Sequence, residues 1–209
     1  MRRLFTGLSA LLAFGFALPA RADRGGFTLE GGGIVSAARV PPGMGTGESV
    51  FGTMGGATLG VRYALDNNIE LTVSGVWTNP VPFHNNDTTV VTSSSPFTGQ
   101  LYSEVNRVGG AVGADWVTGL VFRFHAGVEA GWSRIAFTNL NLVDAGVALG
   151  SRNVDGIVLA PRIALQWMAT DNLSFAVSPR VEFMLGEPQM TAFSTSITAS
   201  YSWYGWFRR

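Results

Sequence analysis

The sequence predicts an all-β protein, an eight-stranded antiparallel up-and-down transmembrane β-barrel preceded by a cleaved signal peptide. Three observations lead to this fold class. Apolar and polar residues alternate along successive segments, and the turns between those segments alternate between short and long. No apolar run after the N-terminus reaches the roughly 18 residues of a membrane helix. The composition agrees, because 46% hydrophobic residues, 27 Gly and only 13% charged residues are unusual for a water-soluble domain.

The first 22 residues form the predicted signal peptide. Arg2 and Arg3 precede an apolar segment over residues 4–18, and an Ala-Arg-Ala sequence ending at Ala22 supplies the small residues of a cleavage site. We expect cleavage after Ala22, which leaves the barrel domain as residues 23–209. The alternative, an N-terminal membrane anchor, is disfavoured because the apolar segment is short.

Residues 120–132 show the strand pattern most clearly. Even positions are apolar from Leu120 to Trp132, whereas odd positions include Arg123, His125 and Glu129. Side chains of a strand alternate between the two sides of the sheet, so the apolar groups point one way and the ionisable groups the other. The polar face is rich in Gly, Arg and His, which favours a barrel lumen over the exposed face of a soluble sandwich. Thirteen residues exceed the roughly 9–11 that a membrane strand needs.

Seven further segments complete the predicted meander. The eight predicted strands are residues 27–39, 56–65, 69–78, 101–116, 120–132 (reaching 135 at most), 153–168, 173–184 and 191–207. Three short turns at residues 66–68, 117–119 and 170–172 alternate with longer loops at 40–55, 79–100, 136–152 and 186–190. Both termini fall on the side of the short turns. Outer-membrane barrels have this asymmetry, with short periplasmic turns and longer extracellular loops.

Aromatic residues at the two ends of the strands support the same orientation. When each strand is given its direction, one group gathers at the turn end and another at the loop end, as expected for rings at two bilayer interfaces. The turn-end group is Phe27, Tyr63, Trp116, Phe122, Trp167, Trp203 and Phe207; the loop-end group is Trp77, Tyr102, Trp132, Phe183 and Phe193.

Alternation also assigns a set of ionisable residues to the lumen. The acidic members are Glu30, Glu70, Asp115, Glu129 and Glu182, and the basic members are Arg62, Arg107, Arg123, Arg162 and Arg180, with His125 among them. An eight-stranded barrel is just wide enough to be filled by side chains, and buried charges are tolerated when they are paired. We therefore expect a salt-bridged plug, with a gated polar pathway as the alternative. For His125 a hydrogen-bonded interior role is favoured.

These features resemble the small eight-stranded outer-membrane barrels of the OmpA/OmpX type, over residues 27–207. The most specific local element is the aromatic C-terminal stretch, which resembles the signal recognised by the outer-membrane assembly machinery; it comprises Tyr201, Trp203, Gly205 and Phe207. This chain departs from the family pattern because Arg208 and Arg209 follow Phe207. The resemblance implies a Gram-negative outer membrane, contact with membrane lipid and a monomeric state.

Several other functions are disfavoured by the residues present. The chain has no Cys, which excludes disulfides and lipid attachment through a cysteine. It has no Lys, and removal of the signal peptide leaves 11 basic against 14 acidic residues, so no nucleic-acid partner is expected. No metal-ligand cluster or phosphate-cradling loop is apparent. His84 lies near Asp87 and three serines, as a catalytic Ser/His/acid set would require. In a Ser/Thr-rich loop, however, this spacing has no diagnostic value, and a solvated surface histidine is the better interpretation.

Three classes of function remain at this stage. The first is a structural or surface-interaction barrel without cofactor or enzymatic activity, in which the extracellular loops bind a ligand that the sequence does not identify. The second is a small-molecule channel of the OmpW kind, which requires an apolar lumen or a lateral opening; the sequence gives no sign of such a lumen. The third is a lipid A-modifying barrel enzyme. We expect residues 79–100 to be the main binding loop, with Phe83 and Phe97 contacting a partner or folding back onto the rim.

Overall fold

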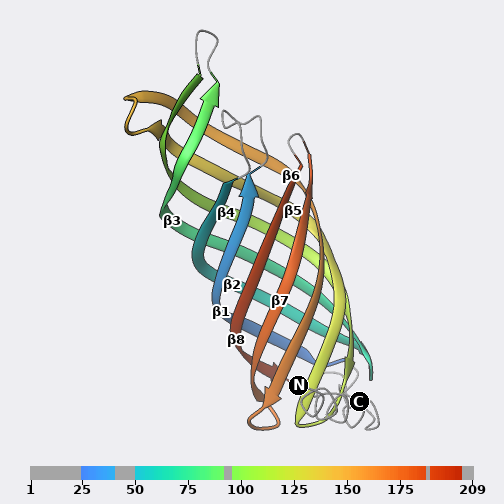
Figure 1. The fold of residues 1–209 in the computed structure, drawn as a ribbon. Coiled ribbons are helices and arrows are strands. Elements are labelled where there is room, and N and C mark those ends of the chain that lie inside the picture. The colour runs from blue at the N-terminus through green and yellow to red at the C-terminus, as the bar shows by residue number, and fades with distance from the viewer. Residues whose placement is uncertain (1–24, 41–49, 92–95, 187–188, 204–209) are drawn as a thin grey trace, which may run out of the picture.

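The computed structural model describes residues 25–40, 50–91, 96–186 and 189–203 as one closed antiparallel barrel (Figure 1). Its strands are β1 (Phe27–Val40), β2 (Val50–Asp66), β3 (Ile69–Val91), β4 (Pro96–Thr118), β5 (Phe122–Leu142), β6 (Val147–Met168), β7 (Leu173–Leu185) and β8 (Met190–Trp203). Each strand pairs with the next along the chain, and β1 closes the ring by pairing with β8. The predicted fold class is confirmed. The predicted signal peptide lies outside the described residues.

The four central strands are much longer than predicted. Residues 79–91 continue β3 and residues 96–100 belong to β4, so the predicted long loop is an extended hairpin. The next predicted loop, residues 136–152, is likewise made of strand residues on both sides of a turn at 143–146. The predicted loop at 40–55 was also too long, because β2 begins at Val50.

β-Bulges explain why the alternation of apolar and polar residues did not predict these strand segments. The register between β3 and β4 shifts between Thr78 and Val81 and again between Asn85 and Thr88. In β5, Asn139 has a φ of 54°, and the inward positions change from odd to even there, with Phe137 and Leu140 both buried. A bulge bends the strand and interrupts its alternation while the ladder continues beyond it.

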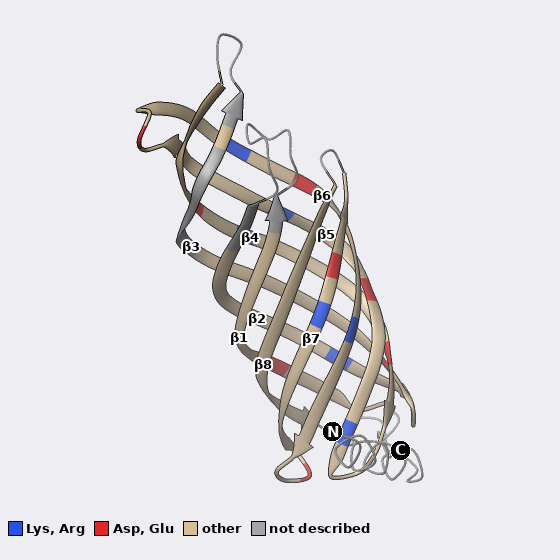
Figure 2. Cartoon of the chain, viewed as in Figure 1, with Lys and Arg blue, Asp and Glu red and all other residues tan. Residues whose placement is uncertain are grey.

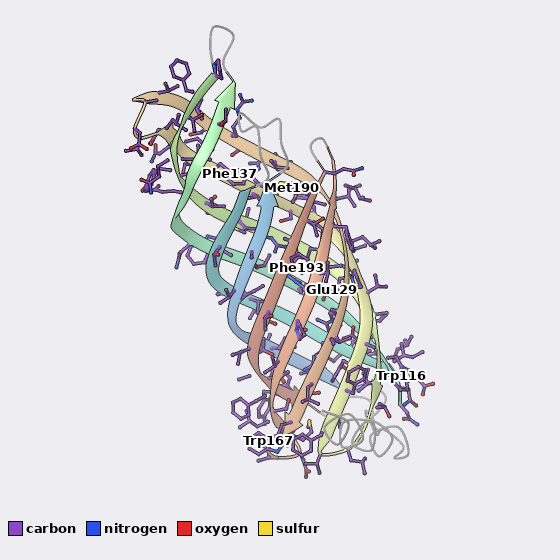
Figure 3. All side chains as sticks on the ribbon, viewed as in Figure 1. Trp116, Glu129, Phe137, Trp167, Met190 and Phe193 are labelled. Carbon is purple, nitrogen blue, oxygen red and sulfur yellow. The ribbon has the colours of Figure 1, made fainter. Side chains whose placement is uncertain are left out.

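The outer wall of the barrel is apolar. Among the described residues, thirty-three large hydrophobic side chains are exposed, including Leu59 at 62% and Ile197 at 65%, which suits contact with hydrocarbon rather than water. Trp116 and Trp167 lie at the end of the barrel that holds the short turns (Figure 3). Ring pairs such as Phe27 with Tyr63, 4.8 Å between centroids, strengthen that end. In the described part of the chain, no helix is long and apolar enough to cross a membrane.

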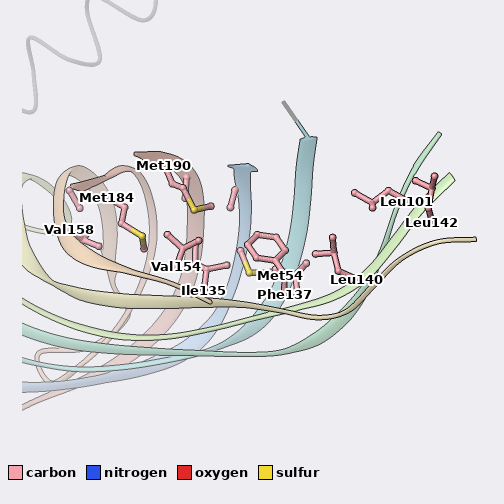
Figure 4. Close-up of a cluster of buried hydrophobic side chains, with 14 residues drawn as sticks. Met54, Leu101, Ile135, Phe137, Leu140, Leu142, Val154, Val158, Met184 and Met190 are labelled. Atoms are coloured by element: carbon pink, nitrogen blue, oxygen red, sulfur yellow. The ribbon is translucent and has the colours of Figure 1, made fainter. Parts of the chain in front are cut away.

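The interior is divided into two chemically different halves. The loop-end half contains a buried apolar cluster whose described members come from every strand except β3, including Met54, Phe137, Val154 and Met190 (Figure 4). Phe97 is partly buried against this cluster, so it folds back onto the barrel. The expectation of a lumen without an apolar section was therefore wrong. Five of the cluster's fourteen residues, Met54, Phe137, Leu140, Leu142 and Met190, come from segments that the sequence pattern had assigned to loops, where no inward face was considered.

Candidate functional site

The turn-end half of the lumen holds the ionisable side chains that alternation assigned to it. Figure 2 shows acidic and basic positions along β7 and neighbouring strands within a wall that is otherwise almost uncharged. The structure joins nine of the predicted residues by ion pairs between arginine and carboxylate. They are Glu30, Arg62, Glu70, Arg107, Asp115, Glu129, Arg162, Arg180 and Glu182, which we call the lumen network.

At the turn-end side of the network, Arg62 of β2 lies between carboxylates of its two neighbouring strands. Its Nε is 3.2 Å from Glu30 Oε2 on β1, and its Nη1 is 3.3 Å from Glu70 Oε2 on β3. The guanidinium also donates to Ser200 Oγ on β8 at 3.3 Å. One arginine thus links four consecutive strands across the closure of the barrel.

The centre of the network is a chain of alternating charges. Arg162 of β6 forms a two-point ion pair with Asp115 of β4 and lies 3.0 Å from Glu129 Oε1 of β5. The other oxygen of Glu129 accepts from Arg180 of β7 at 3.0 Å, and Arg180 Nε lies 2.6 Å from Glu182 Oε1. The Asp115 and Glu129 side chains are fully buried, and each has a cation beside it, which buried carboxylates require.

Arg107 of β4 completes the network on the side of the apolar cluster. Its Nη1 donates to Glu182 Oε1 at 2.9 Å, and its Nε donates to Ser133 Oγ at 2.9 Å. Ser194 of β8 donates a further hydrogen bond to Glu182 Oε1 at 2.8 Å. Glu182 therefore connects strands from opposite sides of the lumen.

His125 lies beside the network and is almost completely buried. Its Nε2 is 2.8 Å from Gln166 Oε1, and Gln166 in turn donates to Ser174 Oγ at 2.6 Å. Its Nδ1 lies 3.8 Å from carboxylate oxygens of Glu70 and Asp115. One hydrogen bond, to Gln166, holds the ring in the interior.

Arg123 occupies a different position from the other predicted arginines. It stands two residues before His125 on β5, close to the turn end, and is half-buried. Its neighbour in the register on β6 is Gln166. Arg123 is thus at the border of the lumen rather than at its centre.

Little empty space remains around the lumen network. Two small cavities border it, one of about 10 Å³ beside Arg107 and one of about 30 Å³ beside Arg62 and His125. A single water molecule occupies about this much space. Above them the apolar cluster fills the loop-end half. Side chains therefore fill much of the lumen beside the network and the cluster.

The central strands extend beyond the barrel wall at the loop end. Pairing of β2 with β3 stops at Gly56 and Thr78, and pairing of β6 with β7 stops at Ile157 and Leu185, as far as the described residues show. Residues 79–91, 96–106, 134–142 and 147–156 beyond these pairs form a four-stranded sheet that we call the β3–β6 extension (Figure 1).

The outer face of the extension is polar, in contrast to the wall below it. The change occurs at Trp132, whose ring lies 5.7 Å from the Arg134 guanidinium, and Arg134 pairs with Asp155 at 2.7 Å. Further out, the outward positions on β4, β5 and β6 carry mainly uncharged polar groups that are exposed or half-buried. They include Thr98, Gln100, Tyr102, Asn106, Thr138, Asn141 and Asn153. This sequence of apolar wall, aromatic ring and polar sheet places the extension outside a bilayer.

The remaining predicted sites are only partly described. Tyr201 and Trp203 of the C-terminal stretch are exposed on β8, 5.0 Å apart between ring centroids. Gly205 and Phe207 lie outside the described residues, as does the His84 side chain. Within the ranges that are described, no group of three or more His, Asp or Glu side chains has an arrangement suited to a metal ion.

The fold defines the class of protein: a small bacterial outer-membrane barrel of eight antiparallel strands. The solved structures that it resembles include Ail, the attachment invasion locus protein of Yersinia pestis, with a TM-score of 0.54 and 15% identity over 86% of this chain and 99% of Ail. Ail has also been solved with the heparin analogue sucrose octasulfate. OprG of Pseudomonas aeruginosa matches with a TM-score of 0.57 and 12% identity over 90% of this chain and all of OprG.

A third structure of the same kind is Neisserial surface protein A, with a TM-score of 0.52 and 10% identity over 85% of this chain and 99% of that protein. No protein-family model matches the sequence, and no curated protein matches it either. At these identities the likeness concerns the fold.

Proposed function

We propose that this protein resides in the bacterial outer membrane as a monomer and acts as a structural or surface-interaction protein. The lumen network and the apolar cluster close the barrel, so that no solute passes along its axis. The β3–β6 extension is presented at the cell surface and binds a partner there. No enzymatic step is assigned to the chain.

The observation that carries this proposal is the length of the central strands. β3, β4, β5 and β6 have 23, 23, 21 and 22 residues, whereas a tilted strand needs roughly 9–11 to cross the membrane. The 13 residues of β3 beyond Thr78 alone span roughly 40 Å at about 3.3 Å per residue. A sheet of this size is unnecessary for reconnecting strands, and its apolar inner face gives it a rigid base for recognition.

The chemistry of the outer face suggests a partner recognised through hydrogen bonds. Tyr102, Asn106 and Asn153 offer donors and acceptors without charge, and the cation of Arg134 is already paired with Asp155. The binding of a heparin analogue by Ail would call for a cationic surface. The described part of this extension and its turn carries two arginines, Arg134 and Arg152, against three acidic residues, Glu104, Asp144 and Asp155, so its charge is not cationic overall. We therefore propose an uncharged glycan or a protein surface as the partner.

The test compares bacteria that produce the native protein with bacteria that produce an extension variant, on a panel of immobilised neutral glycans and matrix proteins. In one variant Asn-Gly replaces residues 86–100, which keeps Asn85 opposite Leu101 as the closing pair of a shorter hairpin. A second variant combines Asn106→Ala with Asn153→Ala. Both should remain folded and lose retention on the surface that holds the native strain.

A matched control variant carries Asn67→Ala with Asp171→Ala in the turns at the opposite end of the barrel. It should be retained like the native protein. If the native strain is retained on no surface, or if the extension variants and the control behave alike, the extension is not the binding site.

The apolar cluster favours a second candidate, a channel for small apolar molecules. Its buried Phe137, Ile135 and Met190 form a lumen section suited to hydrocarbons, above the lumen network. This candidate predicts that liposomes containing the protein take up a small aromatic solute faster than empty liposomes do. The surface-interaction proposal predicts equal rates, because the ion pairs below the cluster close the axial path.

A further inference from the structure

A surface groove lies on the outside of the barrel. It is a groove of about 410 Å³ that crosses β6, β7 and β8 near the middle of β7. Arg162, Arg180 and Ser194 also contribute to its lining. Apolar side chains and one threonine form its outward-facing walls, namely Pro161, Ile163, Pro179, Val181, Phe193 and Thr195.

An interruption of the β6–β7 ladder coincides with this groove. The register is the same on both sides of the interruption, from Ile157 opposite Leu185 to Met168 opposite Ser174. Between Leu159 and Leu165, however, the only residue of β6 that is still paired is Arg162, which lies opposite Arg180. By the same register Pro161 lies opposite Val181, and Pro179 lies opposite Ile163. Proline has no N–H to donate to the ladder. One proline on each strand therefore weakens the same short stretch of the barrel wall.

A side-chain hydrogen bond confirms where a ladder bond is missing. The hydroxyl of Ser178 donates to the carbonyl of Ile163 at 3.1 Å, and Ile163 is the residue opposite Pro179. A buried carbonyl needs a donor, and within a bilayer no water supplies one. Ser178 thus replaces the N–H that Pro179 lacks, so this carbonyl is not left unsatisfied where the ladder is interrupted.

We propose that this groove is a binding site for one acyl chain of a membrane lipid. Its outward walls are continuous with the apolar wall that faces the bilayer, where acyl chains are the surrounding material. An empty groove would lose dispersion contacts on all its walls, and a flexible hydrocarbon chain restores them. Phe193 of β8, which lies midway along the barrel (Figure 3), bounds the groove on one side and gives the chain a flat surface to pack against.

The test uses native protein refolded into phosphatidylcholine vesicles that contain a small fraction of phosphatidylcholine with a diazirine halfway along one acyl chain. After irradiation, the labelled residues are mapped by mass spectrometry. Ile163, Val181 and Phe193 should carry severalfold more label than Val61 and Val73, which face lipid from another part of the wall.

Two variants fill the groove from different strands, Thr195→Phe on β8 and Val181→Phe on β7, and Ala199→Phe is the control on β8 outside the groove. In either filling variant that folds, as judged by the gel shift of the unheated protein, excess labelling of Ile163 should disappear; in the control it should persist. Equal labelling of both wall regions in the native protein, or undiminished labelling of Ile163 in a folded filling variant, would overturn the proposal.

Discussion

The replacement of Arg162 by Met should destabilise the barrel by about 3 kcal/mol, at the lower end of the roughly 3–5 kcal/mol expected when a buried ion pair loses one partner. Arg162 is the partner of two fully buried carboxylates. Glu129 keeps Arg180 at 3.0 Å, but Asp115 is left with only the imidazole of His125 within ion-pair distance among the described side chains, at 3.8 Å. We expect a loss at the lower end of the roughly 3–5 kcal/mol range because Glu129, one of the two carboxylates, still has Arg180 beside it.

Unfolding in urea measures this effect. The protein is refolded into lipid vesicles, and unfolding is followed by tryptophan fluorescence and by the gel shift between folded and unfolded forms. The variant Arg134→Met is the matched control, because Arg134 forms a similar two-point ion pair with Asp155 on the exposed face of the extension. Exposed pairs contribute little, so the control should unfold close to the native protein.

A double-mutant cycle separates the lost ion pair from lost packing. Asp115→Asn removes the carboxylate that Arg162→Met leaves behind, so the double variant should be less destabilised than the sum of the two single variants. Loss of less than about 1 kcal/mol for Arg162→Met, or additive single effects, would refute the view that the lumen network compensates buried carboxylates.

Three further predictions concern the barrel as a whole. The protein should fractionate with the outer membrane and migrate faster unheated than boiled on a detergent gel, because a closed sheet has no edge from which to unravel; equal mobility of both samples speaks against a closed barrel. Gly127→Ala should lower the free energy of unfolding, measured in urea, by about 1–3 kcal/mol, because the added Cβ would lie 2.3 Å from the Ala114 carbonyl oxygen. Gly33→Ala should leave that free energy almost unchanged, because no atom lies nearer than 3.9 Å to the added Cβ. A similar loss in both glycine variants would contradict the tight wall at Gly127. Phe207→Ala should lower the fraction of protein assembled in cells, as measured by the heat-modifiable band; an unchanged fraction would remove Phe207 from the assembly signal.

Strict alternation was sufficient to predict the membrane part of the barrel. Along β5, the odd positions from Arg123 to Glu129 and the even positions from Phe122 to Trp132 belong to opposite faces in the structure as they do in the sequence. The same rule placed Arg62, Arg162 and the other charged residues in one lumen. It did not provide the pairing, because several arginines have two carboxylates within reach and only the barrel geometry selects between them.

The extension and the β6–β7 groove were not predictable in this way. Beyond Thr78, β3 lies outside the hydrocarbon region, so its sequence no longer alternates between apolar and polar residues. Its pairing with β4 nevertheless continues to Val91. Residues 79–100 contain three prolines and many Ser, Thr and Asn residues, which are typical of loops. Pro161 and Pro179 are 18 positions apart in the sequence, and only the register of β6 with β7 brings them to the same stretch of wall.

The central claim is that side chains close the lumen and that function therefore lies at the surface of the barrel. Current through planar lipid bilayers containing the purified native protein tests this claim most directly. The ion pairs among Arg162, Glu129 and Arg180 cross the lumen, and the cavities described beside them measure about 10 and 30 Å³, so we expect no stable single-channel steps at any moderate voltage. Reproducible steps that persist in repeatedly purified protein would contradict the claim and show that the lumen conducts ions.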